Sequence, residues 1–137
     1  MTDVLIVTHG RLGEALLESA SMISGRTDGT QAIGFLPGQG VEDLDAAVRQ
    51  ALKRMSANGA VLCLVDIPGG SPARVAASMI AEYPDLEVLA GVSLPMLLEV
   101  LLMRDSMTMP ELIQHGIAAG LQAVVDLGLV FRSQLVG

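Results

Sequence analysis

Aromatic residues are nearly missing from this sequence. Its 137 residues include no Trp, one Tyr and two Phe, which together make up 2% of the chain. A hydrophobic core must therefore be built from aliphatic residues and the eight Met. Apolar residues still make up 51% of the chain, which argues against disorder. At this length we expect a single domain that spans residues 1–137.

Positive charge is also scarce. Eight Lys and Arg face fifteen Asp and Glu, so the formal net charge is −7. An acidic chain is poorly suited to nucleic acid or to an anionic membrane surface, because both repel it. We therefore expect no nucleic-acid partner.

Long apolar runs and cysteine pairs are lacking as well. The longest stretch without a charged residue, 112–125, contains His115 and two Gly, and is too short and polar to cross a bilayer. Asp3 and the short apolar patch 4–7 do not fit a signal peptide. The single Cys63 cannot form an internal disulfide. These absences predict a cytoplasmic protein with no direct membrane insertion.

What the sequence does contain is a series of short apolar runs separated by segments of helical periodicity. This alternation is typical of an α/β fold with a doubly wound, mainly parallel sheet and helices on both faces. For its first four strands we predict the common order 2-1-3-4, with a short C-terminal strand added. The strands are expected at Val4–Val7, Gln31–Leu36, Ala60–Val65, Glu87–Ala90 and Leu129–Phe131.

Helical spacing and end signals place the helices between these runs. Gly25 is expected to end the first helix, and Thr108 with Glu111 to form a capping box that opens the last long one. The segment 96–103 is apolar nearly all round, which predicts burial. The inward faces are expected at Leu12, Leu16, Ala20 and Ile23 in the first helix, at Val41, Leu44, Val48, Leu52 and Met55 in the second, and at Val75, Met79 and Ile80 in the third.

The stretch from Ala60 to Pro72 organises the chemistry. An apolar strand ends on Asp66, and Gly69 and Gly70 then free the backbone for a tight turn. Ser71 suits a helix N-cap and Pro72 suits the first helical position. A helix that starts here offers N–H groups to an anion, phosphate above all. We therefore expect Gly69, Gly70 and Ser71 to bind phosphate.

A second chemically able residue, His9, ends the first strand. In the order 2-1-3-4 the first and third strands are neighbours, so His9 and Asp66 should meet beyond their carboxyl ends. A carboxylate on one ring nitrogen fixes the tautomer and leaves the other nitrogen as a nucleophile. Arg11 and Arg74 lie at the starts of the first and third helices, where cations are disfavoured. There they either remain solvated or form a positive rim that binds phosphoryl oxygens.

The residues alone leave other functions open. A histidine at a strand end is often structural, and His115 has no nearby partner in the sequence. A nucleotide- or flavin-binding module could use the same fold, although no Gly-rich fingerprint follows the first strand. A hydrolase built on Ser71 would need Gly-x-Ser-x-Gly, whereas Pro72 and Ala73 follow this serine.

Four motifs together resemble one known family. The segments Val-Thr-His9-Gly10, Phe35-Leu-Pro-Gly38, Asp66-x-x-Gly-Gly-Ser-Pro72 and Ala90-Gly-Val-Ser-Leu-Pro-Met-Leu97 occur in this order. They resemble the IIA domain of mannose/sorbose-type sugar phosphotransferase systems (PTS), and the likeness runs from Thr2 to about Val125. The resemblance implies a dimer in which a C-terminal strand is exchanged between subunits.

The same resemblance implies a function and partners. A histidine matched by His9 would take a phosphoryl group from the phosphocarrier HPr and pass it to a IIB component, and an aspartate matched by Asp66 would orient it. No cofactor or metal is implied, and association with a membrane IIC/IID permease is expected. Pro68 and Ser93 depart from the family, which often has an aromatic residue and Asn there, so the rim of the site and its partner could differ. A mainly regulatory role for a free-standing IIA protein remains an alternative.

Overall fold

The fold is a three-layer α/β sandwich around one parallel sheet. The computed structural model describes residues 1–136. Its four strands lie in the order β2-β1-β3-β4 and every pairing is parallel, as predicted. The strands are β1 Asp3–His9, β2 Thr30–Phe35, β3 Val61–Val65 and β4 Leu86–Ala90. Because β1 and β3 are central and neighbouring, their carboxyl ends meet at the middle of one sheet edge.

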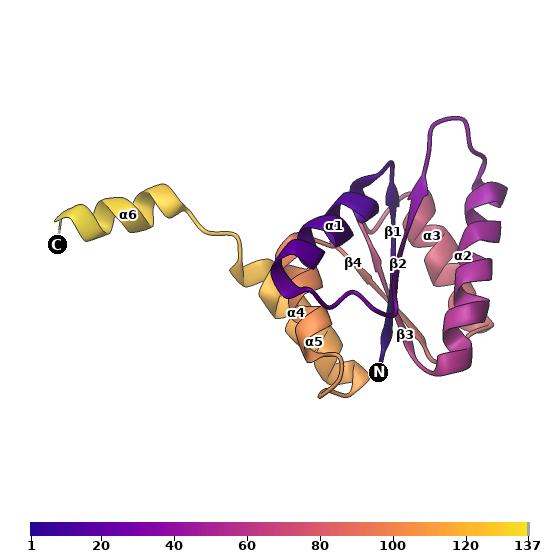
Figure 1. Ribbon diagram of the computed structural model, residues 1–137. Helices are drawn as coiled ribbons and strands as arrows, with labels where there is room; N and C mark the ends of the chain where they lie inside the picture. The colour runs from indigo at the N-terminus through magenta and orange to yellow at the C-terminus, as the bar shows by residue number, and fades with distance from the viewer. Residues whose placement is uncertain (137) are drawn as a thin grey trace.

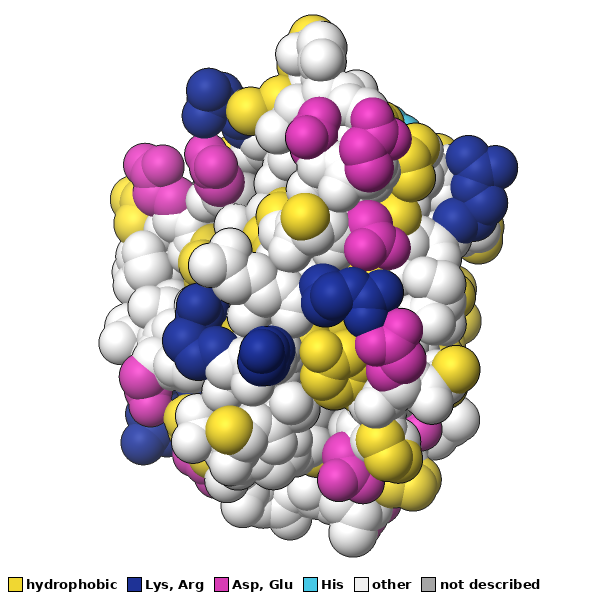
Figure 2. All heavy atoms as spheres, turned by 90° about the vertical axis from the view of Figure 1, so that its right-hand side faces the viewer, with side chains coloured by type: hydrophobic (Ala, Val, Ile, Leu, Met, Phe, Trp, Pro, Cys, Tyr) yellow, Lys and Arg dark blue, Asp and Glu magenta, His cyan; other side chains and the backbone are white. Residues whose placement is uncertain are grey.

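Helices cover both faces of the sheet (Figure 1). One face carries α1 Leu12–Ser24, α4 Leu94–Met103 and α5 Met109–Gln122, and the other carries α2 Val41–Met55 and α3 Ser71–Ser78. Short 3₁₀ turns, η1 Ser56–Asn58 and η2 Met79–Ala81, follow α2 and α3, and α6 is Leu127–Val136. Mixed acidic and basic side chains cover the outer α2–α3 face rather than one basic patch (Figure 2).

Strand residues alternate between two apolar clusters. Leu5 and Val7 of β1 face α2 and α3, whereas Val4 and Ile6 face α1 and α4. All four are fully buried, because both faces of a parallel sheet are covered by helices. Cys63 lies in the first cluster at the centre of β3, and burial raises the pKa of its thiol to about 12.

Several local signals act as predicted. Gly25 adopts the left-handed conformation, with φ of 66°, and closes α1 with its N–H on the Ser21 carbonyl. Thr108 and Glu111 form the predicted capping box of α5. In α4 the residues Met96, Leu97, Val100 and Leu101 are buried, while Leu102 is exposed. The predicted inward face of α2 is buried except for Val41.

Other predictions were wrong in detail. Leu12, Ile23 and Ile80 are exposed; Leu12 begins α1, Ile23 is the second-last residue of α1, and Ile80 lies in the short turn η2 that follows α3. Gly70, not Ser71, is the N-cap of α3, and Pro72 is therefore its second residue. Gly70 has φ of 104°, so the tight turn lies at a predicted glycine, whereas the helix begins one residue earlier than predicted.

The predicted C-terminal strand is a helix. Leu129–Phe131 lies inside α6, which stands away from the body of the molecule (Figure 1). Its start is capped by Asp126, whose Oδ1 accepts the Leu129 N–H at 2.9 Å and whose carbonyl accepts the Val130 N–H at 3.2 Å. Such a cap favours a helix over a strand for an apolar run this short. Its apolar side chains are exposed, notably Leu127, Leu129, Val130, Phe131 and Leu135.

No single helix within residues 1–136 has both the length and the apolar composition of a membrane span. Only α5 and α6 taken together reach that composition, and they are bent by 61° at the break between them.

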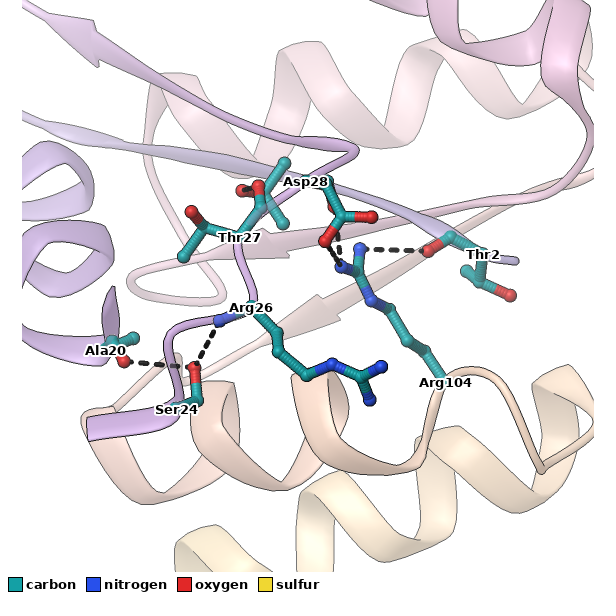
Figure 3. Close-up of polar contacts among 8 residues, drawn as sticks. Thr2, Ala20, Ser24, Arg26, Thr27, Asp28 and Arg104 are labelled. Atoms are coloured by element: carbon teal, nitrogen blue, oxygen red, sulfur yellow. Dashed lines mark hydrogen bonds and ion pairs between the residues drawn. The ribbon is translucent and has the colours of Figure 1, made fainter. Parts of the chain in front are cut away.

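At the amino ends of the strands, Arg104 ties three segments together (Figure 3). Its side chain is 2% exposed, and its guanidinium donates to the carbonyls of Thr2, at 3.4 Å, and Asp28, at 2.5 Å. The Asp28 carboxylate lies 3.6 Å away but is 75% exposed. The turn after α4 is thereby fixed to the start of β1 and to the loop before β2.

Candidate functional site

The predicted meeting of His9 and Asp66 occurs. Asp66 Oδ2 lies 2.8 Å from His9 Nδ1 and also accepts the His9 backbone N–H at 2.9 Å. One carboxylate oxygen therefore holds both the main chain and the ring of the histidine. The other oxygen, Oδ1, accepts the Ile67 N–H at 3.0 Å. Because Asp66 directly follows β3, whose partner is β1, parallel pairing of these strands brings the two residues together.

Exposure differs sharply between the two side chains. His9 is 48% exposed, whereas Asp66 is 11% exposed. Burial alone would raise the pKa of the Asp66 carboxyl, but hydrogen bonds from the His9 N–H, the His9 ring and the Ile67 N–H hold that pKa below its ordinary value. The carboxylate therefore remains charged near neutral pH. It can accept a hydrogen bond from a protonated Nδ1, which leaves Nε2 with a free lone pair.

Gly70 lies directly against the other edge of the His9 ring. A Cβ placed on Gly70 would come within 3.1 Å of His9 Cε1 and 3.4 Å of Nε2. Together with its positive φ, this close approach means that a larger residue would crowd the free nitrogen. Nε2 therefore faces the turn that opens α3, whose first N–H groups have no carbonyl acceptors within the helix.

The remaining predicted site residues are arranged less tightly. Gly69 and Ser71 flank Gly70 in the chain, but a Cβ built on Gly69 would meet no atom within 4 Å. Arg11 is the N-cap residue of α1, is 73% exposed, and pairs with Glu14 at 3.4 Å. Arg74, in the first turn of α3, is exposed. Among the residues that the structure describes, neither arginine hydrogen-bonds to His9 or Asp66.

The two residues that depart from the resembled family have separate places. Ser93 is the N-cap of α4, where its Oγ accepts the Met96 N–H at 3.4 Å. Pro68 is exposed and, with Arg74 and Ile80, lines a hollow of about 310 Å³ beside β4. Pro68 therefore lines a hollow on the α3 side of β4, and Ser93 caps the start of a helix.

Three residues that contact the site are missing from the predicted set. Phe35 ends β2 opposite His9, with its ring centroid 6.4 Å from that of the imidazole. Gly34 lies against the Gly10 carbonyl, where a Cβ would approach the oxygen to 2.1 Å. The buried Thr8 hydroxyl accepts the Gly13 N–H at 2.9 Å and so fixes the start of α1. Two sequence signals could have drawn attention to Phe35, namely the scarcity of aromatic residues and its place in the segment Phe35-Leu-Pro-Gly38.

Metal-ligating side chains do not cluster in the part of the chain that the structure describes. Within residues 1–136, no group of three or more His, Cys, Asp or Glu side chains could hold a metal ion together. His115 lies far from His9 in the fold, on α5, with Nδ1 3.5 Å from Glu99. The His9 site therefore combines an imidazole, a carboxylate that orients it and the start of a helix. Chemically, this combination suits a site that holds a phosphoryl group.

Comparison with known proteins gives consistent results. Residues 3–116 match the family described as EIIA-man, PTS system fructose IIA component. The chain is 42% identical to the PTS system fructose-specific EIIA component of Bacillus subtilis over 115 residues, or 84% of this chain and 79% of that one. It is 35% identical to the PTS system mannose-specific EIIAB component of Escherichia coli K12 over 125 residues. That match covers 90% of this chain but only 39% of the longer protein.

Solved structures show the same fold. Phosphotransferase system component EIIA from Streptococcus agalactiae superposes with a TM-score of 0.86 at 28% identity, covering 94% of this chain and 99% of that one. The mannose/sorbose-specific IIA subunit from Enterococcus faecalis gives a TM-score of 0.82 at 29% identity, with coverage of 91% and 93%.

Proposed function

The chain belongs to the EIIA-man family of PTS IIA components, of the mannose/sorbose type, and from this membership we propose that His9 carries the phosphoryl group. Phospho-HPr is the proposed donor and a IIB component the proposed acceptor. The observation that carries the proposal is the 2.8 Å contact between Asp66 Oδ2 and His9 Nδ1, which leaves Nε2 open beside Gly70.

The proposed reaction is an in-line displacement at phosphorus. The Nε2 lone pair of neutral His9 attacks the phosphorus of the donor, and an Nε2–P bond forms. The bond between phosphorus and the donor breaks, and its electron pair stays on the donor. The ring keeps its Nδ1 proton and becomes a phosphorylated imidazolium, whose positive charge the Asp66 carboxylate stabilises. Transfer to IIB repeats these steps in reverse.

The α3 turn is proposed to receive the phosphoryl oxygens. Gly69, Gly70 and Ser71 precede or begin a helix whose N-terminus carries partial positive charge. Developing negative charge on the phosphoryl group would be stabilised by backbone N–H donors there. Arg11 and Arg74 complete the proposal as exposed cations near the same end of the sheet, suited to attracting an anionic donor.

Phosphorylation is tested directly with phospho-HPr and mass spectrometry. We expect an acid-labile phosphate on the peptide that contains His9, and none after His9→Ala. The chain offers a matched control, because His115→Ala removes the only other histidine and should leave labelling intact. Labelling that persists in His9→Ala, or that disappears in His115→Ala, would refute the assignment.

We also propose that the protein is a homodimer held by its C-terminal arm, residues 124–136. Two hollows flank the unpaired edge of β4, one on the α3 side and one, of about 340 Å³, lined by Ser93, Met96, Gly120 and Leu121. Unpaired edges are normally covered, and the arm exposes apolar side chains that nothing in its own chain covers. A second copy would supply an arm to each edge.

Sedimentation at micromolar concentration tests the dimer. Truncation after Asp126 removes α6, and truncation after Ala123 removes the rest of the arm, residues 124–126, as well. We expect the dimer to weaken with the first truncation and to be lost with the second. A full-length chain that sediments as a monomer, or a dimer that survives both truncations, would count against the arm.

The biological setting follows from family membership alone and is likewise proposed. The chain would act in the cytoplasm, and would serve a membrane IIC/IID permease through its IIB partner. Measuring sugar uptake in cells that lack the chain tests this role. Uptake unchanged by the loss would favour a regulatory function over transport.

A further inference from the structure

Phe35 is the residue of the site that the proposed chemistry does not use. It is one of only three aromatic residues in the chain, and it ends β2 directly opposite His9. Its ring meets the imidazole edge-on, with centroids 6.4 Å apart and planes inclined by 60°. Phe35 is partly buried and packs against the apolar cluster beneath α2 and α3, so its own ring is held in place.

The backbone around the histidine is fixed from the same strand. The Phe35 carbonyl accepts the Gly10 N–H at 2.9 Å. Gly34 packs against the Gly10 carbonyl, where a side chain would approach the oxygen to 2.1 Å. The His9 N–H is held by Asp66. With the main chain fixed on both sides, the remaining freedom of His9 lies in its side-chain torsions.

Rotation of the ring would exchange the reactive positions. A half turn about the Cβ–Cγ bond exchanges Nδ1 with Cδ2 and Nε2 with Cε1, so that a carbon would face Asp66 and the free nitrogen would take the place of Cε1. The hydrogen bond to Asp66 opposes this turn, but the imidazole is 48% exposed and water competes for the bond. A flat, rigid neighbour opposes the turn by contact and not by hydrogen bonding, so exposure to water does not weaken it.

We propose that Phe35 is a positioning residue that keeps the His9 ring oriented with Nδ1 on Asp66 and Nε2 beside Gly70. The orientation itself is a property of the free protein, while its consequence for phosphoryl transfer rests on the function proposed above. Leucine at this position would retain an apolar contact but would lose the planar edge that restricts the ring.

Nitrogen NMR of the imidazole in the unphosphorylated protein is the first test. In wild type we expect one tautomer, with the proton on Nδ1. Phe35→Leu should give a mixture of tautomers or ring orientations, and Phe35→Tyr should restore the wild-type spectrum. Tyr83→Leu is the matched control, because Tyr83 packs against the same apolar cluster but lies before β4, at the amino ends of the strands.

Phosphoryl transfer from phospho-HPr is the second test. A misoriented reacting group slows transfer within the bound complex more than it slows formation of that complex. Phe35→Leu should therefore lower the maximal rate roughly tenfold, with little change in the donor concentration that gives half of that rate. Phe35→Tyr should transfer at the wild-type rate. Equal thermal stability of Phe35→Leu and Tyr83→Leu would separate this effect from a general loosening of the fold.

The outcomes separate this inference from the proposed function. A wild-type tautomer in Phe35→Leu, or the same disturbance in Tyr83→Leu, would overturn the positioning role even if His9 is phosphorylated. A disturbed ring with an unchanged transfer rate would overturn the claim that orientation limits transfer. Absence of phosphorylation in wild type would remove the proposed function, whereas the NMR result would still decide whether Phe35 orients the ring.

Discussion

The two ends of the sheet each depend on one charged side chain that joins distant segments, but they use it in opposite ways. At the carboxyl ends, Asp66 holds a histidine 57 positions away, and that histidine is half exposed. At the amino ends, Arg104 holds the carbonyl of Thr2, 102 positions away, and is itself almost fully buried.

The difference lies in what each charge leaves free. The Arg104 guanidinium donates hydrogen bonds to backbone carbonyls and thereby fixes chain segments in place. Asp66 is the less exposed member of its pair, and it fixes a partner whose second nitrogen faces outward. A buried charge whose partners are backbone groups stabilises the fold, whereas a carboxylate beneath an exposed histidine suits the reactive role that we propose for His9.

Asp66→Asn is expected to have the largest effect among the variants that test this contrast. The amide cannot stabilise an imidazolium and can hold the wrong tautomer, so transfer should slow by roughly 10²- to 10⁴-fold while the fold is retained. Stopped-flow transfer assays with phospho-HPr and circular dichroism measure the two quantities. Asp28→Asn alters a carboxylate at the opposite end and should leave the transfer rate unchanged. Wild-type rates in Asp66→Asn would exclude Asp66 from the chemistry.

Arg104→Met should lower the stability of the fold and leave the rate of transfer unchanged. It leaves the carbonyls of Thr2 and Asp28 without a buried donor, which costs about 1–3 kcal/mol in the free energy of unfolding. Urea denaturation measures this loss, and transfer by the folded protein should be unaffected. Arg49→Met is the control, since Arg49 pairs with Asp45 and Glu82 on the surface and its removal should hardly move the midpoint. Equal losses of unfolding free energy in Arg104→Met and Arg49→Met would contradict the stabilising role of the buried Arg104.

A smaller effect is expected from replacing Arg11 and Arg74 with Gln. If both cations attract an anionic donor, the second-order rate of phosphorylation should fall several-fold at low salt and depend less on ionic strength. Arg26→Gln with Arg132→Gln changes the net charge equally, but it removes charge from the loop before β2 and from the arm. If that pair lowered the rate as much, net charge rather than the rim would be responsible.

The smallest expected effect is on the stability of the fold at acidic pH. The folded-state pKa of Asp66 lies below its ordinary value of 3.8, so the unfolded chain binds more protons in that range. The stability contributed by Asp66 is therefore present above about pH 4 and is lost as the pH falls below it. Urea midpoints measured between neutral and acidic pH should fall less steeply in Asp66→Asn than in wild type. Arg104→Met should keep the wild-type slope, because it leaves Asp66 and its partners unchanged.

The sheet and the His9–Asp66 pair could be predicted from local sequence patterns combined with general rules for parallel sheets. Apolar runs and helical spacing define the strands, and the rules for parallel sheets then bring His9 to Asp66. Phe35 and Gly34 were missed as site residues because their roles depend on strand register. No spacing in the sequence reveals that register.

The arm shows a different limit of sequence patterns. Three apolar residues, Leu129–Phe131, suit a strand or a helix equally well, and periodicity cannot decide between them. Asp126 decides in favour of a helix by capping its first turn. The start of α3 was predicted one residue too late for a similar reason, because backbone conformation at Gly70, not the hydroxyl of Ser71, fixes where the helix begins.

The position of Cys63 gives the protein an internal probe of its own opening. The only thiol of the chain lies at the centre of β3, 1% exposed, and its raised pKa keeps it protonated and unreactive. A disulfide reagent can therefore label it only after β3 has separated from its covering helices. The labelling rate should follow the free energy of that opening and should increase more in Arg104→Met than in Asp66→Asn at neutral pH, because the stability that Asp66 contributes is the smaller of the two.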